Sequence, residues 1–174
     1  MTTVAYKLSA EENPAAVLLE FFYPFHYKGG MALEDALRCG QLSRKQVAIL
    51  WLIRSEGEQG KRMRRKDIER SIQTWFEVSS SAITKALRSM ARPPLGLVQI
   101  AEDPQSAREK QVWLTPRGER FLATMVAAGQ KFEQQIVDQL TPEEVSFGIH
   151  FLQRAMAALE HALAQSGGLN AKGR

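Results

Sequence analysis

The stretch at residues 78–90, VSSSAITKALRSM, decides how the middle of the chain folds. On a helix its apolar residues Ile83, Leu87 and Met90 form one stripe, which predicts a face that packs inward. A serine at its start is placed to cap the first turn, because a serine oxygen accepts the free backbone N–H groups there. The opposite face is cationic and rich in hydroxyl groups, and no Asp or Glu occurs at residues 78–92. Such a face favours a polyanionic partner.

Positive charge is concentrated around this stretch. The formal net charge of the chain is +4. Residues 61–120 hold 13 Lys and Arg against 7 Asp and Glu, and the remainder of the chain is slightly acidic. A basic centre between mildly acidic flanks fits a nucleic-acid surface in the middle and assembly helices outside it. Chance clustering of charge on a soluble domain is the alternative.

Length and composition bound the class of protein. The chain has 174 residues, 44% of them hydrophobic, which is enough for one compact domain or for a lobe with an added assembly element. One cysteine excludes an intramolecular disulfide and favours a reducing cytoplasm. Residues 1–12 lack the apolar core of a signal peptide, and no apolar run reaches the roughly 18 residues that span a membrane. We therefore expect a cytoplasmic protein that makes no membrane contact.

The apolar periodicity predicts a mostly helical chain with one hairpin. Helices are predicted at residues 14–27, 31–38, 44–56, 64–76, 79–91, 116–139 and 142–165, and short strands at residues 97–101 and 111–114. Pro24 is expected to bend the first helix, and Lys28-Gly29-Gly30 to break it. Trp51, Trp75 and Phe76 are predicted to face inward. The aromatic residues at 21–27 are too dense for one face of a lone helix, which favours a subunit interface there.

Helix, tight turn, helix and two-stranded hairpin is the order of a winged helix-turn-helix. In that fold the second helix lies in the major groove of DNA, which is about 12 Å wide. Serines at its N-terminus let backbone N–H groups meet a phosphate. The tip of the hairpin, called the wing, can reach into the adjacent minor groove with an arginine. The predicted fold class is therefore mostly α with a small β-hairpin wing.

The arrangement resembles the MarR family of bacterial transcription regulators over about residues 13–164. Residues 79–83 correspond to the family's Ser-x-x-Thr-Val start of the recognition helix, and Gly96-Leu97-Val98 to its Gly-Leu-Val. DPQSAREKQVWLTPRG at residues 103–118 resembles its wing, from Asp-Pro through to Leu-Thr-x-x-Gly. Ser106 and Ala107 depart from the family's Asp and Arg, so Arg108 is expected to be held less firmly. The helix before the turn is also about one turn longer than usual.

The resemblance implies a homodimer. Residues 1–42 and 119–165 would form its dimerisation regions, residues 43–118 the DNA-binding lobe, and residues 166–174 a disordered tail. Each lobe would read half of a pseudo-palindromic operator in double-stranded DNA. The resemblance also leaves open release by an unknown small-molecule effector bound between lobe and dimerisation helices.

The candidate DNA-binding residues fall into three groups. The predicted major-groove residues are Ser79, Ser80, Ser81, Thr84, Lys85, Arg88 and Ser89. The wing residues Arg108 and Lys110 are predicted to reach the minor groove. The run of five cations at residues 61–66 opens the preceding helix in this prediction, and its members Lys61, Arg62, Arg64 and Arg65 are predicted to hold phosphates. The alternatives are a solvated helix face, a flexible hairpin tip and a solubilising run.

Catalysis and cofactors have little support in the sequence. There is no Gly-rich phosphate loop and no nucleophile elbow, and the three histidines lack metal-ligand spacing. We expect no cofactor, no metal and no enzyme activity. Cys39 is interpreted as a structural thiol rather than a redox sensor. The alternative function is a winged-helix adaptor for protein partners, but an adaptor has no need of a recognition helix without acids.

Overall fold

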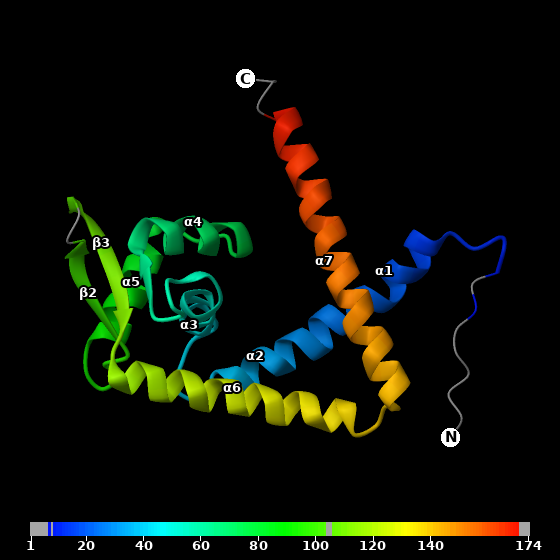
Figure 1. Cartoon of the computed structure of the whole chain (residues 1–174), viewed down its shortest axis with the longest axis horizontal. Coiled ribbons are helices and arrows are strands. Elements are labelled where there is room, and N and C mark those ends of the chain that lie inside the picture. The colour runs from blue at the N-terminus through cyan, green and yellow to red at the C-terminus, as the bar shows by residue number, and fades with distance from the viewer. Residues whose placement is uncertain (1–6, 8, 104–105, 171–174) are drawn as a thin grey trace. The chain divides into compact units, whose positions relative to one another are not determined.

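The computed structural model describes residues 7, 9–103 and 106–170, and its elements follow the predicted order with one added strand (Figure 1). They are α1 (Pro14–Phe25), a π-helical segment η1 (His26–Gly30), α2 (Met31–Leu37), α3 (Arg44–Glu56), β1 (Arg62–Arg64), α4 (Arg65–Trp75), α5 (Ser80–Ala91), β2 (Val98–Asp103), β3 (Ser106–Leu114), α6 (Pro116–Val137) and α7 (Pro142–Asn170). The described residues up to Lys131 form one compact unit, and those from Phe132 onward form a second. The mostly helical fold with a small wing is confirmed.

The first helical region is continuous where a break was predicted. Asn13 caps α1, accepting a hydrogen bond from the Ala15 N–H at 3.0 Å, and Pro24 lies inside the helix. The predicted break at Lys28-Gly29-Gly30 is wrong, because these residues belong to the π-helical turn η1 that leads directly into α2. A helical glycine costs only about 1 kcal/mol relative to alanine, and the helix on either side continues through the pair.

Helix α3 is the centre of the lobe formed by residues 43–118. Four of its side chains have no exposed surface, namely Ile49, Leu50, Leu52 and Ile53. Helices α2, α4 and α5 and strand β1 all contact α3. The buried stripe of α5 and the residues Ile68 and Ile72 of α4 complete the core around it. A helix with apolar residues on nearly all of its faces must be enclosed from several sides.

Two tryptophans predicted to face inward are exposed instead. Trp51 of α3 is 38% exposed, and the Arg54 guanidinium lies 4.9 Å from its ring centroid. Trp75 is 48% exposed, because it is the last residue of α4 and lies beyond the stripe of Ile68 and Ile72. Phe76 is half-buried and packs against the core, as predicted.

The wing is a three-stranded antiparallel sheet in the order β1-β3-β2. Val98 pairs with Leu114 and Glu102 with Lys110, after which the register shifts. The strands are longer than the predicted runs. Strand β1 was missed because three residues are too few to show a period. Arg62 pairs with Trp113 and Arg64 with Gln111, so the start of the cationic run is a strand and not a helix.

Two positions of the wing motif require glycine for steric reasons. Gly96 adopts a φ of 56°, in the left-handed region that glycine enters without strain. Gly118 lies so close to the segment before β2 that an added Cβ would come 1.9 Å from the carbonyl oxygen of Leu97. Thr115 joins the two segments: its hydroxyl donates to the Gly96 carbonyl at 2.7 Å and accepts from the Gly118 N–H at 3.0 Å.

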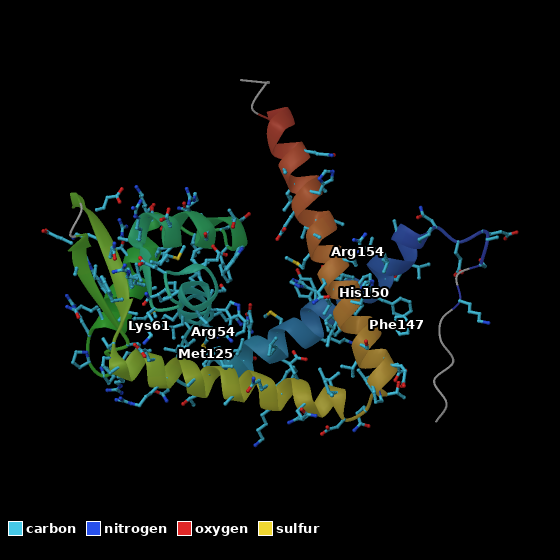
Figure 2. All side chains as sticks on the ribbon, viewed as in Figure 1. Arg54, Lys61, Met125, Phe147, His150 and Arg154 are labelled. Atoms are coloured by element: carbon cyan, nitrogen blue, oxygen red, sulfur yellow. The ribbon has the colours of Figure 1, made fainter. Side chains whose placement is uncertain are left out.

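Helix α6 begins in the lobe, where Leu122 and Met125 join the core (Figure 2). Further along, Gly129 permits a close approach to α2, because an added Cβ would lie 2.8 Å from a methyl carbon of Leu37. The helix ends at Val137, two residues before its predicted end.

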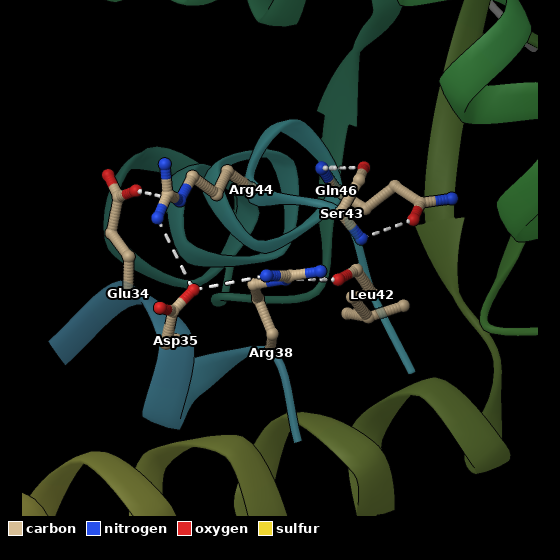
Figure 3. A network of polar contacts seen from close by, with 7 residues as sticks. All are labelled: Glu34, Asp35, Arg38, Leu42, Ser43, Arg44 and Gln46. Carbon is tan, nitrogen blue, oxygen red and sulfur yellow. Dashed lines mark hydrogen bonds and ion pairs between the residues drawn. The ribbon is translucent and has the colours of Figure 1, made fainter. Parts of the chain in front are cut away.

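The junction of α2 and α3 is polar (Figure 3). The Arg44 guanidinium lies 3.1 Å from Glu34 and 3.3 Å from Asp35. Arg38 donates to Asp35 at 3.0 Å and to the Leu42 carbonyl at 2.8 Å, and its hydrogen bond is the main reason that the pKa of Asp35 is lowered. At the start of α3, Ser43 and Gln46 form a reciprocal capping box. These contacts fix the direction in which α3 leaves α2.

The second unit contains the end of α6 and all of α7. The Thr141 hydroxyl accepts from the Glu144 N–H at 3.2 Å, and the Glu144 carboxylate accepts from the Thr141 N–H at 2.8 Å. This reciprocal cap begins α7 where it was predicted. Helix α7 continues through Asn170, past its predicted end at residue 165, and residues 171–174 of the predicted tail lie outside the described residues. In the part of the chain that the structure describes, no helix combines the length and apolarity needed to cross a bilayer.

The close approach at Gly118 generates a stability prediction. Gly118→Ala should destabilise the lobe by about 1–3 kcal/mol or more, because the new methyl group meets backbone rather than a side chain that can move. Urea unfolding followed by tryptophan fluorescence measures this, since all three tryptophans lie in the lobe. Arg117→Ala, on the exposed side of the same turn, should stay within about 0.5 kcal/mol of the wild type. Equal stabilities for the two variants would contradict the steric account.

Candidate nucleic-acid interface

The exposed face of α5 is built by the packing of its other face. Ser79 caps the helix, accepting from the Ala82 N–H at 3.3 Å, and Ile83, Leu87 and Met90 are buried as predicted. The opposite face borders a groove lined by Ser81, Thr84, Lys85, Arg88, Ser89 and Arg92. Among the described residues, none of the three cations in this set has an acidic partner. Arg92, one turn beyond Arg88, extends the predicted site.

A second groove lies between α4, α5 and the wing. Its lining residues are Arg65, Lys66, Thr84, Leu87, Arg88, Ile100, Glu109 and Lys110. Thr84 and Arg88 therefore border both grooves, and the fold brings the start of α4 and the wing strand beside the recognition helix. The lining contains four cations and one acid. Its apolar floor, Leu87 and Ile100, belongs to the core and to β2.

Arg65 supports helix α5. Its guanidinium donates to the Thr84 hydroxyl at 2.8 Å and forms an ion pair with Glu69 at 3.1 Å. The Thr84 hydroxyl in turn donates to the Ser80 carbonyl one turn earlier, at 2.8 Å. Arg65 thus connects α4 to α5, and the predicted phosphate contact from Arg65 must be made by a side chain that already has two partners.

The wing contributes an acid that was not predicted. The Glu109 carboxylate forms ion pairs with Lys66 and, at 3.6 Å, with Arg64. These contacts join β3 to the point where β1 passes into α4. The sequence carries no signal for them, because they depend on the pairing of β1 with β3. Lys66, a member of the cationic run that is predicted to hold phosphates, also lines the second groove.

Lys61 and Arg62 lie apart from the two grooves. The Lys61 ammonium is 3.0 Å from Glu119 of α6, at the junction of the wing and that helix (Figure 2). The Arg62 guanidinium lies 4.6 Å from the centroid of the Trp113 ring and is paired with Glu58, whose pKa it lowers. The prediction that residues 61–66 open a helix together is wrong, since the run crosses from a turn through a strand into α4 and its side chains diverge.

The remaining candidate residues are placed as follows. Lys110 lines the second groove, and Ser80 begins α5. Arg108, with Ser106 and Ala107, lies outside the residues whose side chains are described, so its minor-groove role stays a prediction. Cys39 is half-buried, and this burial raises the pKa of its thiol, which disfavours a reactive thiolate. No group of three or more potential metal ligands occurs among the side chains that the structure describes.

The lobe matches a known domain family. The family described as winged helix DNA-binding domain matches residues 42–118 of this chain. The transcriptional regulator HosA of Escherichia coli O111:H- is 32% identical over 63 residues, which are 36% of this chain and 47% of HosA. HosA of Escherichia coli O157:H7 is 30% identical over 61 residues, 35% of this chain and 45% of that protein. The chain thus spans about half the length of the curated relatives it matches.

Solved structures share the fold of nearly the whole chain. A mutant of MarR from E. coli has a TM-score of 0.64 and 20% identity, with 84% of this chain and 98% of that chain covered. A mutant of MepR from S. aureus has a TM-score of 0.64 and 19% identity, with 85% and 99% covered. A MarR family transcription regulator has a TM-score of 0.65 and 20% identity, with 87% and 93% covered. With identities of 19–20%, these structures show a shared fold.

The contact between Arg65 and Thr84 generates a testable coupling. In a double-mutant cycle with Arg65→Met and Thr84→Val, we expect a coupling of about 0.5–1.5 kcal/mol in the free energy of unfolding. Either substitution alone breaks the hydrogen bond between the two side chains, so the second substitution has no further bond to remove. Urea unfolding of the four proteins measures it. The matched cycle is Lys61→Met with Glu119→Gln, an exposed pair whose coupling should fall in the range of about 0.2–1 kcal/mol. A coupling near zero for Arg65 and Thr84 would remove the supporting role of Arg65.

Proposed function

Because residues 42–118 form a winged helix DNA-binding domain and the chain has the fold of MarR-type regulators, we propose that this protein is a sequence-specific transcriptional regulator. It acts in the bacterial cytoplasm as a homodimer on a pseudo-palindromic operator. Residues 43–118 read the DNA, and residues 1–42 and 119–165 supply the dimerisation regions. The unidentified small-molecule effector implied by the family resemblance stays a prediction.

The observation that carries this proposal is the contrast between two sets of cations. Each cation of the run at residues 61–66 is paired with a carboxylate. Lys85, Arg88 and Arg92 on α5 have no acidic partner among the described residues, and the α5 face contains no acid at all. Unpaired cations beside short hydroxyl side chains suit base edges and phosphates in a major groove.

Each part of the interface has a proposed role. Lys85 and Arg88 read base edges in the major groove, with the hydroxyls of Ser79, Ser80, Ser81, Thr84 and Ser89 beside them. Lys110 and Arg108 follow the wing into the minor groove. Lys61, Arg62, Arg64 and Arg65 contribute to phosphate binding, which strengthens affinity for every sequence and makes it depend on salt.

Exposed apolar side chains support the homodimer. On α1 the exposed residues are Leu18, Leu19, Phe21, Phe22, Tyr23 and Phe25. On α7 they include Phe147, Ile149, Phe151, Leu152, Met156, Leu159 and Leu163. Apolar surface of this extent is rarely left in water, so a second copy of the chain is its proposed cover. A dimer of this kind must hold its two recognition helices about 34 Å apart, one turn of DNA.

The proposed function is tested by fluorescence anisotropy with labelled DNA from just upstream of the protein's own gene. Excess unlabelled random duplex serves as the competitor. Binding that survives the competitor would support a sequence-specific regulator, and footprinting would then locate the operator. An absence of binding even at low salt would contradict the proposal and favour the adaptor for protein partners.

Arg88 borders both grooves, so its substitution is the most direct test of the proposed interface. Arg88→Ala should weaken specific binding by about 1–3 kcal/mol, or about 5- to 150-fold in Kd, if its guanidinium contacts a base. The matched control is Arg70→Ala, which removes the same charge from an exposed position of α4 that lines neither groove. Equal affinities for the two variants in the anisotropy titration would remove Arg88 from the interface.

The dimer is tested by placing charge on α1. Phe22→Glu with Phe25→Glu should shift the protein from dimer to monomer, because an unpaired carboxylate is costly to bury in an apolar interface. Sedimentation velocity measures the mass, which is 19.5 kDa for one chain. Trp75→Glu is the control, since Trp75 is an exposed aromatic residue of the lobe and its replacement should leave the dimer intact. A wild-type monomer, or a dimer in the charged variant, would contradict the proposed interface.

A further inference from the structure

Glu109 is an acid inside a groove that is otherwise cationic. The second groove is lined by Arg65, Lys66, Arg88 and Lys110, and Glu109 is the one carboxylate in its lining. Its side chain is 27% exposed, less than that of either cation with which it pairs. An acid on a DNA-facing surface repels phosphate, so its presence there calls for a compensating role.

The two ion pairs of Glu109 add polar contacts between β3 and the point where β1 passes into α4. Strand β3 carries Glu109 toward the wing tip, beyond the last residue pair with β1, which is Arg64 with Gln111. Past that point, the Glu109 carboxylate connects β3 to Arg64 at the end of β1 and to Lys66 in the first turn of α4. Helix α4 is in turn joined to the recognition helix through Arg65 and Thr84. The wing, α4 and α5 are therefore coupled through one chain of polar contacts.

We propose that Glu109 is a positioning residue that sets the specificity of DNA binding. This inference rests on the proposed function. By holding Arg64 and Lys66, the carboxylate fixes the angle of the wing to α5, so that both meet their grooves at once on the correct sequence. The ion pair with Lys66 also keeps that cation from binding phosphate on every sequence. Glu109 thus strengthens specific binding and weakens non-specific binding.

These two effects have opposite signs, which separates them from a simple change of charge. Non-specific affinity comes from neutralised phosphates, and each additional phosphate contact steepens the dependence of log K on log salt by about 0.9. A variant without the carboxylate releases Lys66 from its ion pair and loosens the wing. Its non-specific affinity should rise while its specific affinity falls. Added positive charge alone would raise both affinities together.

The experiment compares Glu109→Gln with the wild type on two duplexes of equal length. One carries the site footprinted for the wild-type protein, and the other has a random sequence. For Glu109→Gln we expect specific affinity to fall about fivefold or more, on the scale of one lost groove contact. On the random duplex the salt slope should steepen by about 0.9 and the affinity should rise. Thermal unfolding of the variant checks that the lobe is folded.

Two further variants sharpen the test. Glu56→Gln makes the same change of charge at an exposed residue that lines neither groove, so it should raise both affinities slightly or leave them unchanged. Adding Lys66→Ala to Glu109→Gln removes the cation released by the first substitution. The random-duplex slope should then return toward the wild-type value without recovery of specific affinity.

The outcomes distinguish this inference from the proposed function. Wild-type protein that shows no preference for any site would overturn both. Wild-type protein that binds its site specifically, together with a Glu109→Gln variant that behaves like Glu56→Gln, would overturn the role of Glu109 alone. A fall in specific affinity with an unchanged salt slope would also overturn it, because Lys66 would then not be held by the carboxylate.

Discussion

The enclosure of α3 is the constraint on which the rest of the lobe depends. Its side chains Ile49, Leu50, Leu52 and Ile53 have no contact with water, so the chain must surround it with apolar faces. Helix α5 supplies one of those faces through Ile83, Leu87 and Met90. A short helix that commits one stripe to a core has only its other face left for solvent or a partner. The direction in which Lys85 and Arg88 point is therefore set by the hydrophobic core.

Polar contacts then refine what the core has positioned. Gln46, which caps α3 from within, also donates to Ser89 of α5 at 3.4 Å. Arg65 holds Thr84 from the side of α4, and Thr115 joins the two ends of the wing at Gly96 and Gly118. These contacts are few, and each supports an element of the proposed DNA surface. The surface is consequently held in part by Gln46 and Thr115, which line neither groove.

Helices and their caps, which depend on local residue pattern, could be predicted from the sequence. Strand β1 and the ion pairs around it, which depend on the pairing of distant strands, could not. Helix α3 and its capping serine, the buried stripe of α5 and the caps of α6 and α7 follow from periodicity and from residue types at helix ends. Strand β1 could not be found, because three residues show no alternation and its partner lies about 50 residues away. With β1 unseen, the partners of Arg64 and Lys66 were unseen too. Trp75 continues the apolar stripe of α4 but is exposed, because it lies after the last turn of the helix that packs against the core. The periodicity of a helix does not show where that packing ends.

The π-helical turn between α1 and α2 carries a consequence for how such chains diverge. A π-turn is the form taken by a helix that has gained one residue without losing its hydrogen-bonded continuity. One residue corresponds to about 100° of rotation around the helix axis. Gain or loss of a single residue at His26–Gly30 therefore rotates the exposed aromatic residues of α1 relative to α2, while α2 keeps its contacts with α3 and α6. Evolution can in this way redirect an assembly surface by a single codon and leave the core of the lobe unchanged.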